Sequence, residues 1–160
     1  MSRFEGLAAR IGQELVDLDQ VVRRSQSLEA KAQRTGDVDF LDGVALNLHG
    51  FYAGLEHVFE TIAREFDESM PSGPDWHRDL LLQMSAPFGT RRSAVIQLAT
   101  RHCLDEYRAF RHVVRNVYTF NLRPSRVHEL VAGLADCLVA VNEDLARFGE
   151  FLASVDESAN

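Results

Sequence analysis

The sequence is poor in residues that stabilise a small fold covalently. It has two cysteines in 160 residues, Cys103 and Cys137. They lack the C-x-x-C or Cys/His spacing of a zinc site, and their spacing does not indicate a disulfide framework. We therefore expect both to be small buried hydrophobic residues, in a chain that needs no disulfide, no metal and no other cofactor.

Long apolar runs are also missing, and the first residues, MSRFEGLAAR, contain no hydrophobic signal core. Neither a membrane span nor a signal peptide fits, so a cytoplasmic protein is expected. Lysine is scarce as well, because 16 of the 17 basic residues are arginines. That bias is typical of GC-rich bacterial coding sequences.

What is present suits one globular domain spanning residues 1–160, with a core over about 3–153. Hydrophobic residues make up 46% and charged residues 26%, which excludes wholesale disorder. The net charge of -7 argues against a general nucleic-acid binder. Residues 91–126, however, hold eight arginines and two acids, a local excess of +6 in an otherwise acidic chain, which favours an anionic partner.

Apolar residues recur every three or four positions through most of the chain, which predicts helices. A Ser2-x-x-Glu5 capping box would open the first helix, which runs to about Arg34 before Thr35-Gly36, and Asp37 would cap the second. The second contains Gly43, Gly50 and Gly54, a pattern that predicts close approach of a neighbouring helix.

The second half of the chain repeats these signals. A loop at residues 69–74 precedes a short helix capped by Asp75, and Pro87 and Gly89 end that helix. Ser93 would open a fourth helix running to 121–124, and Ser125 would cap a fifth. No strand pattern is present, so the predicted fold class is all-α, a bundle of four long helices and one short helix.

Basic side chains gather on one side of the predicted fourth helix. At about 100° per residue, a sector of about 60° holds four of them. These are Arg101, Arg108, His112 and Arg115, flanked by Arg111 and Asn116. The opposite side is apolar: Ala99, Cys103, Phe110, Val114 and Val117.

Solvated helix faces are often charged, and arginine stems cover apolar surface well. A self-paired surface helix, however, usually carries Glu or Asp four residues from its arginines, and Arg108, Arg111 and Arg115 have almost none downstream. The sequence therefore predicts that these arginines meet a phosphate-bearing partner or acids from another chain.

Arg111-x4-Asn116-x-Tyr118, near the end of a long helix, resembles the R-x4-H-x-Y signature of the HEPN superfamily. The resemblance is to the HepT-like toxins that pair with minimal nucleotidyltransferase antitoxins. It extends to the helix order and to two segments, FYAGLEHVFETIA and PSGPDWHRDLL, and covers most of residues 37–150.

The resemblance implies a metal-independent endoribonuclease that acts as a homodimer, with two such helices meeting in a cleft. Arg111 would hold the scissile phosphate of the RNA (tRNA or mRNA), assisted by Arg101, Arg108 and Arg115, while the histidine of the signature transfers protons. Tyr118 corresponds to a tyrosine that the nucleotidyltransferase adenylylates. Bulk and negative charge beside Arg111 would then block phosphate binding.

Asn116 departs from the signature, because an amide cannot exchange a proton near neutral pH. Three interpretations remain open. His112, one helical turn before Asn116, supplies the imidazole; or arginines of both chains act with His112 as a slower, mainly electrostatic catalyst; or the nuclease is dead and the protein is a binding module.

The remaining histidines rate lower as site residues. Arg123-x4-His128 is a literal R-x4-H, but Pro124 places it across a helix boundary, so we interpret it as a decoy. For His49, His57, His77 and His102 a structural role is favoured over ligand binding, and the missing Glu-x-x-His pairs argue against a di-iron bundle.

Three hypotheses follow. The first is a HepT-like ribonuclease toxin with a basic cleft, neutralised by a nucleotidyltransferase antitoxin through Tyr118. The second is a HEPN binding module for nucleotide or RNA, or a docking partner of the nucleotidyltransferase. The third is a plain helical dimer whose arginines meet acids of the acidic body.

Overall fold

The chain folds into five α-helices, described by a computed structural model over residues 2–116, 118 and 121–159. In chain order they are α1 Glu5–Thr35, α2 Phe40–Ile62, α3 Trp76–Met84, α4 Leu98–Asn116 and α5 Pro124–Ser158. None of the described residues belongs to a β-strand. The predicted all-α bundle of four long helices and one short helix is confirmed.

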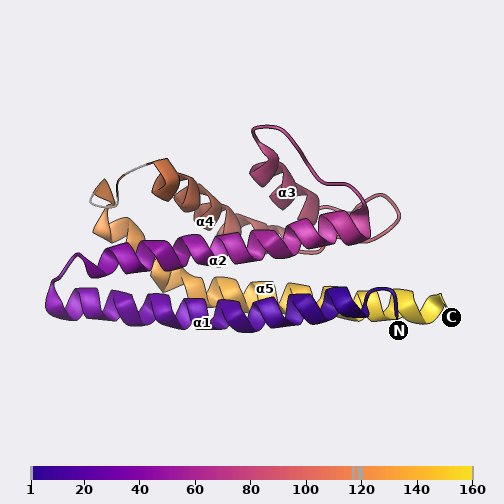
Figure 1. Ribbon diagram of the computed structural model, residues 1–160, viewed down its shortest axis with the longest axis horizontal. Coiled ribbons are helices and arrows are strands. Elements are labelled where there is room, and N and C mark those ends of the chain that lie inside the picture. Colours follow the sequence, from indigo (N-terminus) through magenta and orange to yellow (C-terminus); the bar gives the residue numbers. More distant parts are fainter. Residues whose placement is uncertain (1, 117, 119–120, 160) are drawn as a thin grey trace.

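The long helices lie side by side, and the short one packs near one end. In Figure 1, α1, α2 and α5 run lengthwise, with α3 and α4 above α2. A π-helical turn, η1 Ala63–Asp67, extends α2 and ends at Glu68 in the left-handed conformation. Helix α2 contacts every other helix. Since α3 and α4 also contact each other, these two helices and α2 come together on the side of α2 that faces up in Figure 1.

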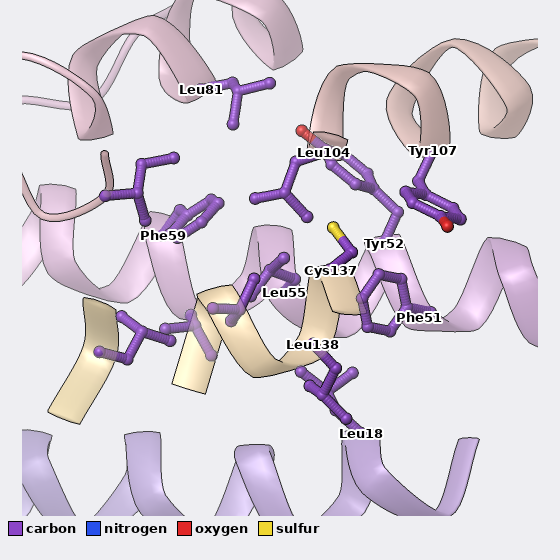
Figure 2. Close-up of a cluster of buried hydrophobic side chains, with 14 of the residues drawn as sticks. Leu18, Phe51, Tyr52, Leu55, Phe59, Leu81, Leu104, Tyr107, Cys137 and Leu138 are labelled. Atoms are coloured by element: carbon purple, nitrogen blue, oxygen red, sulfur yellow. The ribbon is translucent and has the colours of Figure 1, made fainter. Parts of the chain in front are cut away.

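The core draws side chains from all five helices. Figure 2 shows Leu18 of α1, Phe59 of α2, Leu81 of α3, Leu104 of α4 and Leu138 of α5 directed into one cluster. Each is buried. Since every helix contributes to this cluster, burial of apolar surface holds α3 and α4 against α2 and so fixes the surface that they share.

Close approach of α1 to α2, predicted from the glycines of α2, is confirmed at two of the three positions. A Cβ on Gly43 would lie 3.1 Å from Leu28 Cδ1, and one on Gly54 would lie 3.1 Å from Leu18 Cδ2. Gly50 has no such neighbour among the described residues. Gly36 ends α1 with a φ of 70°, the left-handed conformation that glycine adopts at no steric cost.

Two of the predicted helix starts are wrong, because carboxylates of α5 provide the caps. The Ser2 hydroxyl donates to the Glu5 carboxylate, not to the backbone, and the Phe4 N–H donates to Asp156 at 3.1 Å. Likewise α4 begins five residues after Ser93, where Asp144 accepts the Gln97 N–H at 3.0 Å. Such caps come from tertiary contacts that local sequence patterns do not contain.

Three further boundaries differ from the prediction by a few residues. The fourth helix, predicted to run to 121–124, ends at Asn116. Pro124, not the residue after Ser125, opens α5, since a proline in the first turn has no N–H to leave unpaired. The N-cap of α2 is Asp39, whose own N–H is held by the Asp37 carboxylate at 2.9 Å. The predicted N-cap of α3, Asp75, is confirmed in position.

A buried ion pair anchors the segment between α3 and α4. Arg92 donates through Nε and Nη2 to the two oxygens of Asp67, at 2.7 and 2.6 Å, and neither side chain is exposed. Paired, hydrogen-bonded burial of this kind is what such charges require. The segment therefore lies fixed against the end of α2.

The expectation for the cysteines is wrong, because Cys103 and Cys137 form a disulfide. Cys103 is on α4 and Cys137 on α5, and their Cα atoms are 6.1 Å apart. Sequence spacing did not indicate the bond, since only the packing register of α4 on α5 places the two residues opposite each other. The helix that carries the basic residues is thus covalently joined to α5.

The predicted apolar side of α4 is partly right. Phe110 is buried, and Cys103 and Val114 pack against the core, but Ala99 is exposed. Val117 lies outside the described residues. Thr100, Leu104 and Tyr107 are buried instead, so the inward face of the helix is rotated from the expected one.

Within the part of the chain that the structure describes, none of the helices is long and apolar enough to span a membrane. The same residues contain no cluster of three His, Cys, Asp or Glu side chains suited to a metal ion.

Candidate functional site

A groove of about 600 Å³ lies where α3 faces the second half of α4. Its lining is mostly cationic or titratable. The basic and titratable members are His77, Arg78, Arg108, Arg111, His112 and Arg115, and the lining continues through Asn116, Asp75 and Pro74. Among the described lining residues, Asp75 is the acidic one. The groove is therefore suited to an anionic ligand.

The structure brings most of the predicted site residues together. Arg108, Arg111, His112, Arg115 and Asn116 all line the groove. Arg101 does not; its Nη1 donates to the Ser85 hydroxyl at 3.1 Å, towards the start of the helix.

Tyr118 follows the end of α4 and is 73% exposed. Its carbonyl accepts the Asn121 N–H at 2.9 Å.

A buried carboxylate behind the lining of the groove links three helices. Glu56 of α2 is 3% exposed. Its Oε1 accepts from Arg111 Nη1 of α4 at 2.6 Å, and its Oε2 lies 2.7 Å from His77 Nδ1 of α3. Both carboxylate oxygens are thus engaged, which is how a buried acid is accommodated.

The Glu56 contact determines the tautomer of neutral His77. An ionised carboxylate only accepts hydrogen bonds, so the 2.7 Å contact requires a proton on Nδ1. Arg111 Nη1 also lies 3.3 Å from Nδ1, but with Nδ1 protonated this is a contact between two donors and not a hydrogen bond. Nε2 is therefore the ring nitrogen of neutral His77 that can accept a proton.

The expectation that the arginines of α4 lack acidic partners is wrong for two of them. Arg111 pairs with Glu56, and Arg108 pairs through Nε with Asp105 at 2.7 Å. Glu56 lies on another helix, and Asp105 lies three residues upstream of Arg108. The prediction considered acids downstream on the same helix and so included neither one. Arg115 and Arg78 form no ion pair with any described residue, so they carry the unneutralised charge of the groove.

The charge of the groove extends to a neighbouring histidine. His49 on α2 is half-buried, and its pKa is lowered from 6.5 by that burial and then by the positive charges of Arg111 and Arg115. Glu56 acts in the opposite direction but does not outweigh them. The pKa of His49 therefore depends on the positive charge of the groove.

Asn116 and His112 interact within the last turn of α4. The Asn116 Nδ2 donates to the His112 carbonyl at 2.7 Å, and it lies 3.4 Å from His112 Nδ1. Both side chains are exposed. The amide at the position of the signature histidine is thus engaged with the helix backbone beside the imidazole of His112.

The literal R-x4-H pattern, which we interpret as a decoy, lies away from the groove. Arg123 is the N-cap of α5, and His128 Nδ1 lies 2.9 Å from Glu29 Oε1 on α1. Neither residue lines the groove.

The model of the HepT-like protein family matches residues 43–152, more than half of the chain. The chain belongs to this family. The predicted kinship with HepT-like proteins of the HEPN superfamily is thereby confirmed. None of the curated proteins and none of the solved structures matches the sequence significantly.

The match places the groove inside the HepT-like part of the chain. It covers most of α2, all of α3 and α4, and most of α5, while α1 precedes it. Glu56, His77 and every other residue named for the groove fall within the matched range.

Three residues of the site were missed by sequence reasoning: Glu56, His77 and Arg78. His77 was assigned a structural role because it adjoins a loop, and Glu56 is an isolated acid on an apolar helix. The signal was nevertheless present, because Glu56 lies in FYAGLEHVFETIA and the other two in PSGPDWHRDLL, the segments that carried the resemblance beyond α4.

Proposed function

We propose that this HepT-like protein is a toxin that cleaves RNA in the groove between α3 and α4. The observation that carries the proposal is the uncompensated positive charge of Arg78 and Arg115 beside two histidines in one open groove. Cleavage of RNA by its own 2′-hydroxyl needs cations for the phosphate and groups that move protons, and this lining holds both kinds.

The arginines have different roles in this proposal. Arg115 and Arg78 hold RNA phosphates, with Arg108 beside them at lower effective charge because of Asp105. Arg111 is committed to Glu56 through Nη1, so it both lines the groove and supports the buried carboxylate. Two copies of the chain bring two such grooves together in the proposed homodimer.

The test is cleavage of total RNA and a tRNA mixture by the purified protein in EDTA. Arg111→Ala is expected to abolish cleavage and growth inhibition, and Arg115→Ala to weaken RNA binding. Arg24→Ala, an exposed arginine of α1 outside the groove, is the matched control and leaves both unchanged. Full cleavage by Arg111→Ala would contradict the site assignment.

Regulation through Tyr118 is part of the same proposal. A minimal nucleotidyltransferase antitoxin adds AMP to the exposed tyrosine hydroxyl, and the added phosphate competes for the neighbouring groove. Intact-mass analysis after incubation with the partner and ATP should show the added AMP, and Tyr118→Phe should show none. Equal modification of Tyr118→Phe would contradict this assignment.

A binding module is the second candidate, and Asn116 favours it. The amide cannot exchange a proton, and its Nδ2 donates to the His112 carbonyl instead. Wild-type protein that binds RNA through Arg78 and Arg115 but leaves it intact would support this alternative over the ribonuclease.

A further inference from the structure

The ribonuclease proposed above needs a base that the signature position does not supply. Asn116 occupies that position, and an amide does not accept a proton in the neutral pH range. Two imidazoles line the groove, those of His77 and His112. Their surroundings differ, and the difference separates their chemistry.

A buried carboxylate contacts one ring nitrogen of His77, an arrangement common for catalytic imidazoles. Its Nδ1 lies 2.7 Å from Glu56 Oε2, and the other oxygen of that carboxylate is fixed by Arg111 at 2.6 Å. A buried carboxylate behind an imidazole sets its tautomer and orientation and stabilises the imidazolium that forms when the ring takes a proton. Here the carboxylate leaves Nε2 as the accepting nitrogen.

A second contact fixes the plane of the His77 ring. Trp76 stacks on it, with ring centroids 3.7 Å apart and an angle of 30° between the planes. The His77 side chain is 27% exposed and lines the groove. The imidazole is thus immobilised on one edge and one face while still reaching the space that a ligand would occupy.

The other histidines lack this combination. His112 is exposed, and no described carboxylate forms an ion pair with it. His128 does have a buried carboxylate partner in Glu29, but its side chain is 54% exposed and lies outside the groove. Among the described histidines, His77 alone combines a buried carboxylate partner with a place in the groove.

We propose that His77 is the general base of this groove and that Glu56 is its positioning residue; this inference rests on the proposed ribonuclease activity. Nε2 takes the proton of a 2′-hydroxyl, and the freed oxygen forms a bond to the adjacent phosphorus. The bond from phosphorus to the 5′-oxygen breaks, and that oxygen takes a proton from the His112 imidazolium. The products are a 2′,3′-cyclic phosphate and a 5′-hydroxyl, and proton exchange with water restores both rings.

The test compares His77→Ala with wild type on a tRNA mixture in EDTA. The cleavage rate is expected to fall by about 10²- to 10⁴-fold, the contribution of a general base, while tRNA binding is unchanged. Added imidazole should restore part of the rate in His77→Ala, because a free imidazole can enter the space left by the ring. His102→Ala, an exposed histidine of α4 outside the groove, is the matched control and cleaves like wild type.

Each result separates this inference from the function on which it rests. If wild type does not cleave, the ribonuclease proposal and the inference fall together. If wild type cleaves and His77→Ala cleaves equally well, the ribonuclease stands and His77 is not its base. Loss of cleavage without recovery in imidazole would assign His77 a structural role, with His77→Gln and a thermal melt showing whether the fold is intact. Ends bearing a 5′-phosphate would overturn the 2′-hydroxyl mechanism.

The positioning role of Glu56 has a readout that needs no RNA. In ¹⁵N-labelled protein with the His77 ring neutral, Nδ1 should be the protonated nitrogen, whereas free histidine favours a proton on Nε2. Glu56→Gln is expected to shift the ring towards the Nε2–H form, because its amide can donate to Nδ1. A wild-type ring already in the Nε2–H form would overturn the proposed orientation.

Discussion

Glu56 is the residue through which α2, α3 and α4 meet at the groove. One carboxylate oxygen accepts a hydrogen bond from Arg111 of α4, and the other contacts the imidazole of His77 of α3. The three helices are thus connected through one buried side chain. A paired buried carboxylate is costly to disturb, because removal of one partner leaves the other uncompensated. The geometry of the groove therefore depends on a residue that does not appear in its lining.

His49 reports the electrostatic potential of the same site, which leads to a prediction. Burial and the charges of Arg111 and Arg115 disfavour its protonated form, so its pKa in the folded protein should lie below 6.5. Arg115→Gln removes one of the positive charges and should raise the His49 pKa towards 6.5. A titration of the His49 ring protons by NMR measures both values.

The same shift affects stability in a defined direction. Folded His49 binds a proton more weakly than His49 of the unfolded chain does. The free energy of unfolding is therefore highest, as far as His49 is concerned, at pH values above the unfolded pKa. It decreases as the pH falls below 6.5 towards the lowered pKa.

The control for the NMR titration is Arg24→Gln, on the exposed face of α1, which should leave the His49 pKa unchanged. A wild-type His49 pKa at or above 6.5 would contradict the prediction.

At the scale of the helix, α5 serves as the capping element for two others. Asp156 accepts a hydrogen bond from the N–H of Phe4, just before α1. Asp144 accepts one from the N–H of Gln97, just before α4. A carboxylate at a helix N-terminus satisfies an otherwise unpaired N–H and complements the helix dipole. The start of the helix that carries the basic residues is thus set by α5 and not by its own sequence.

The contact between α1 and α2 gives a matched pair of glycine predictions. Gly50→Ala places a methyl group where no described atom lies within 4 Å, so the gain in helix propensity should raise the free energy of unfolding by up to about 1 kcal/mol. Gly54→Ala places it 2.6 Å from Glu14 Oε1, at the end of a flexible side chain, and 3.1 Å from Leu18 Cδ2, in a residue that is only 1% exposed. The substitution should lower that free energy by about 1–3 kcal/mol.

Urea denaturation of the two variants beside wild type measures both changes. The pair controls for propensity, since both substitutions are glycine to alanine within α2. Equal stabilisation by the two would show that α1 yields at Gly54, and the close approach would then not be a constraint on this position.

For the whole molecule, the disulfide between α4 and α5 is expected to contribute to stability. The bond closes a loop with a sequence separation of 34, so reduction should lower the free energy of unfolding by about 4 kcal/mol through the larger entropy of the unfolded chain. Urea denaturation with and without dithiothreitol measures the difference. Cys103→Ser with Cys137→Ala should match the reduced protein.

Thiol titration provides the control for that measurement. The oxidised protein should show no reactive thiol in denaturant without reductant, and two after reduction. Two thiols that react before reduction would contradict the covalent link between the helices.

Local sequence patterns were enough to predict the helices and the family. The period of apolar residues predicted five helices in the right order. Proline and glycine predicted the loop at 69–74 and the stop at Gly36, because these depend on backbone freedom. The resemblance around Arg111 and Tyr118, with two further segments, led to the HepT-like family that the family match confirms. Helical geometry selected five of the residues that line the groove, since they lie on or beside one side of one helix.

The contacts of those residues depend on how the helices pack, which the sequence patterns do not contain. Glu56 is 55 residues from Arg111 and 21 from His77, and such separations leave no periodic signal in the sequence. The caps from Asp144 and Asp156 and the pairing of the two cysteines depend likewise on how α5 packs. Helix formation is governed by neighbours along the chain, whereas ion pairs, caps and disulfides between helices are governed by the register of packed faces.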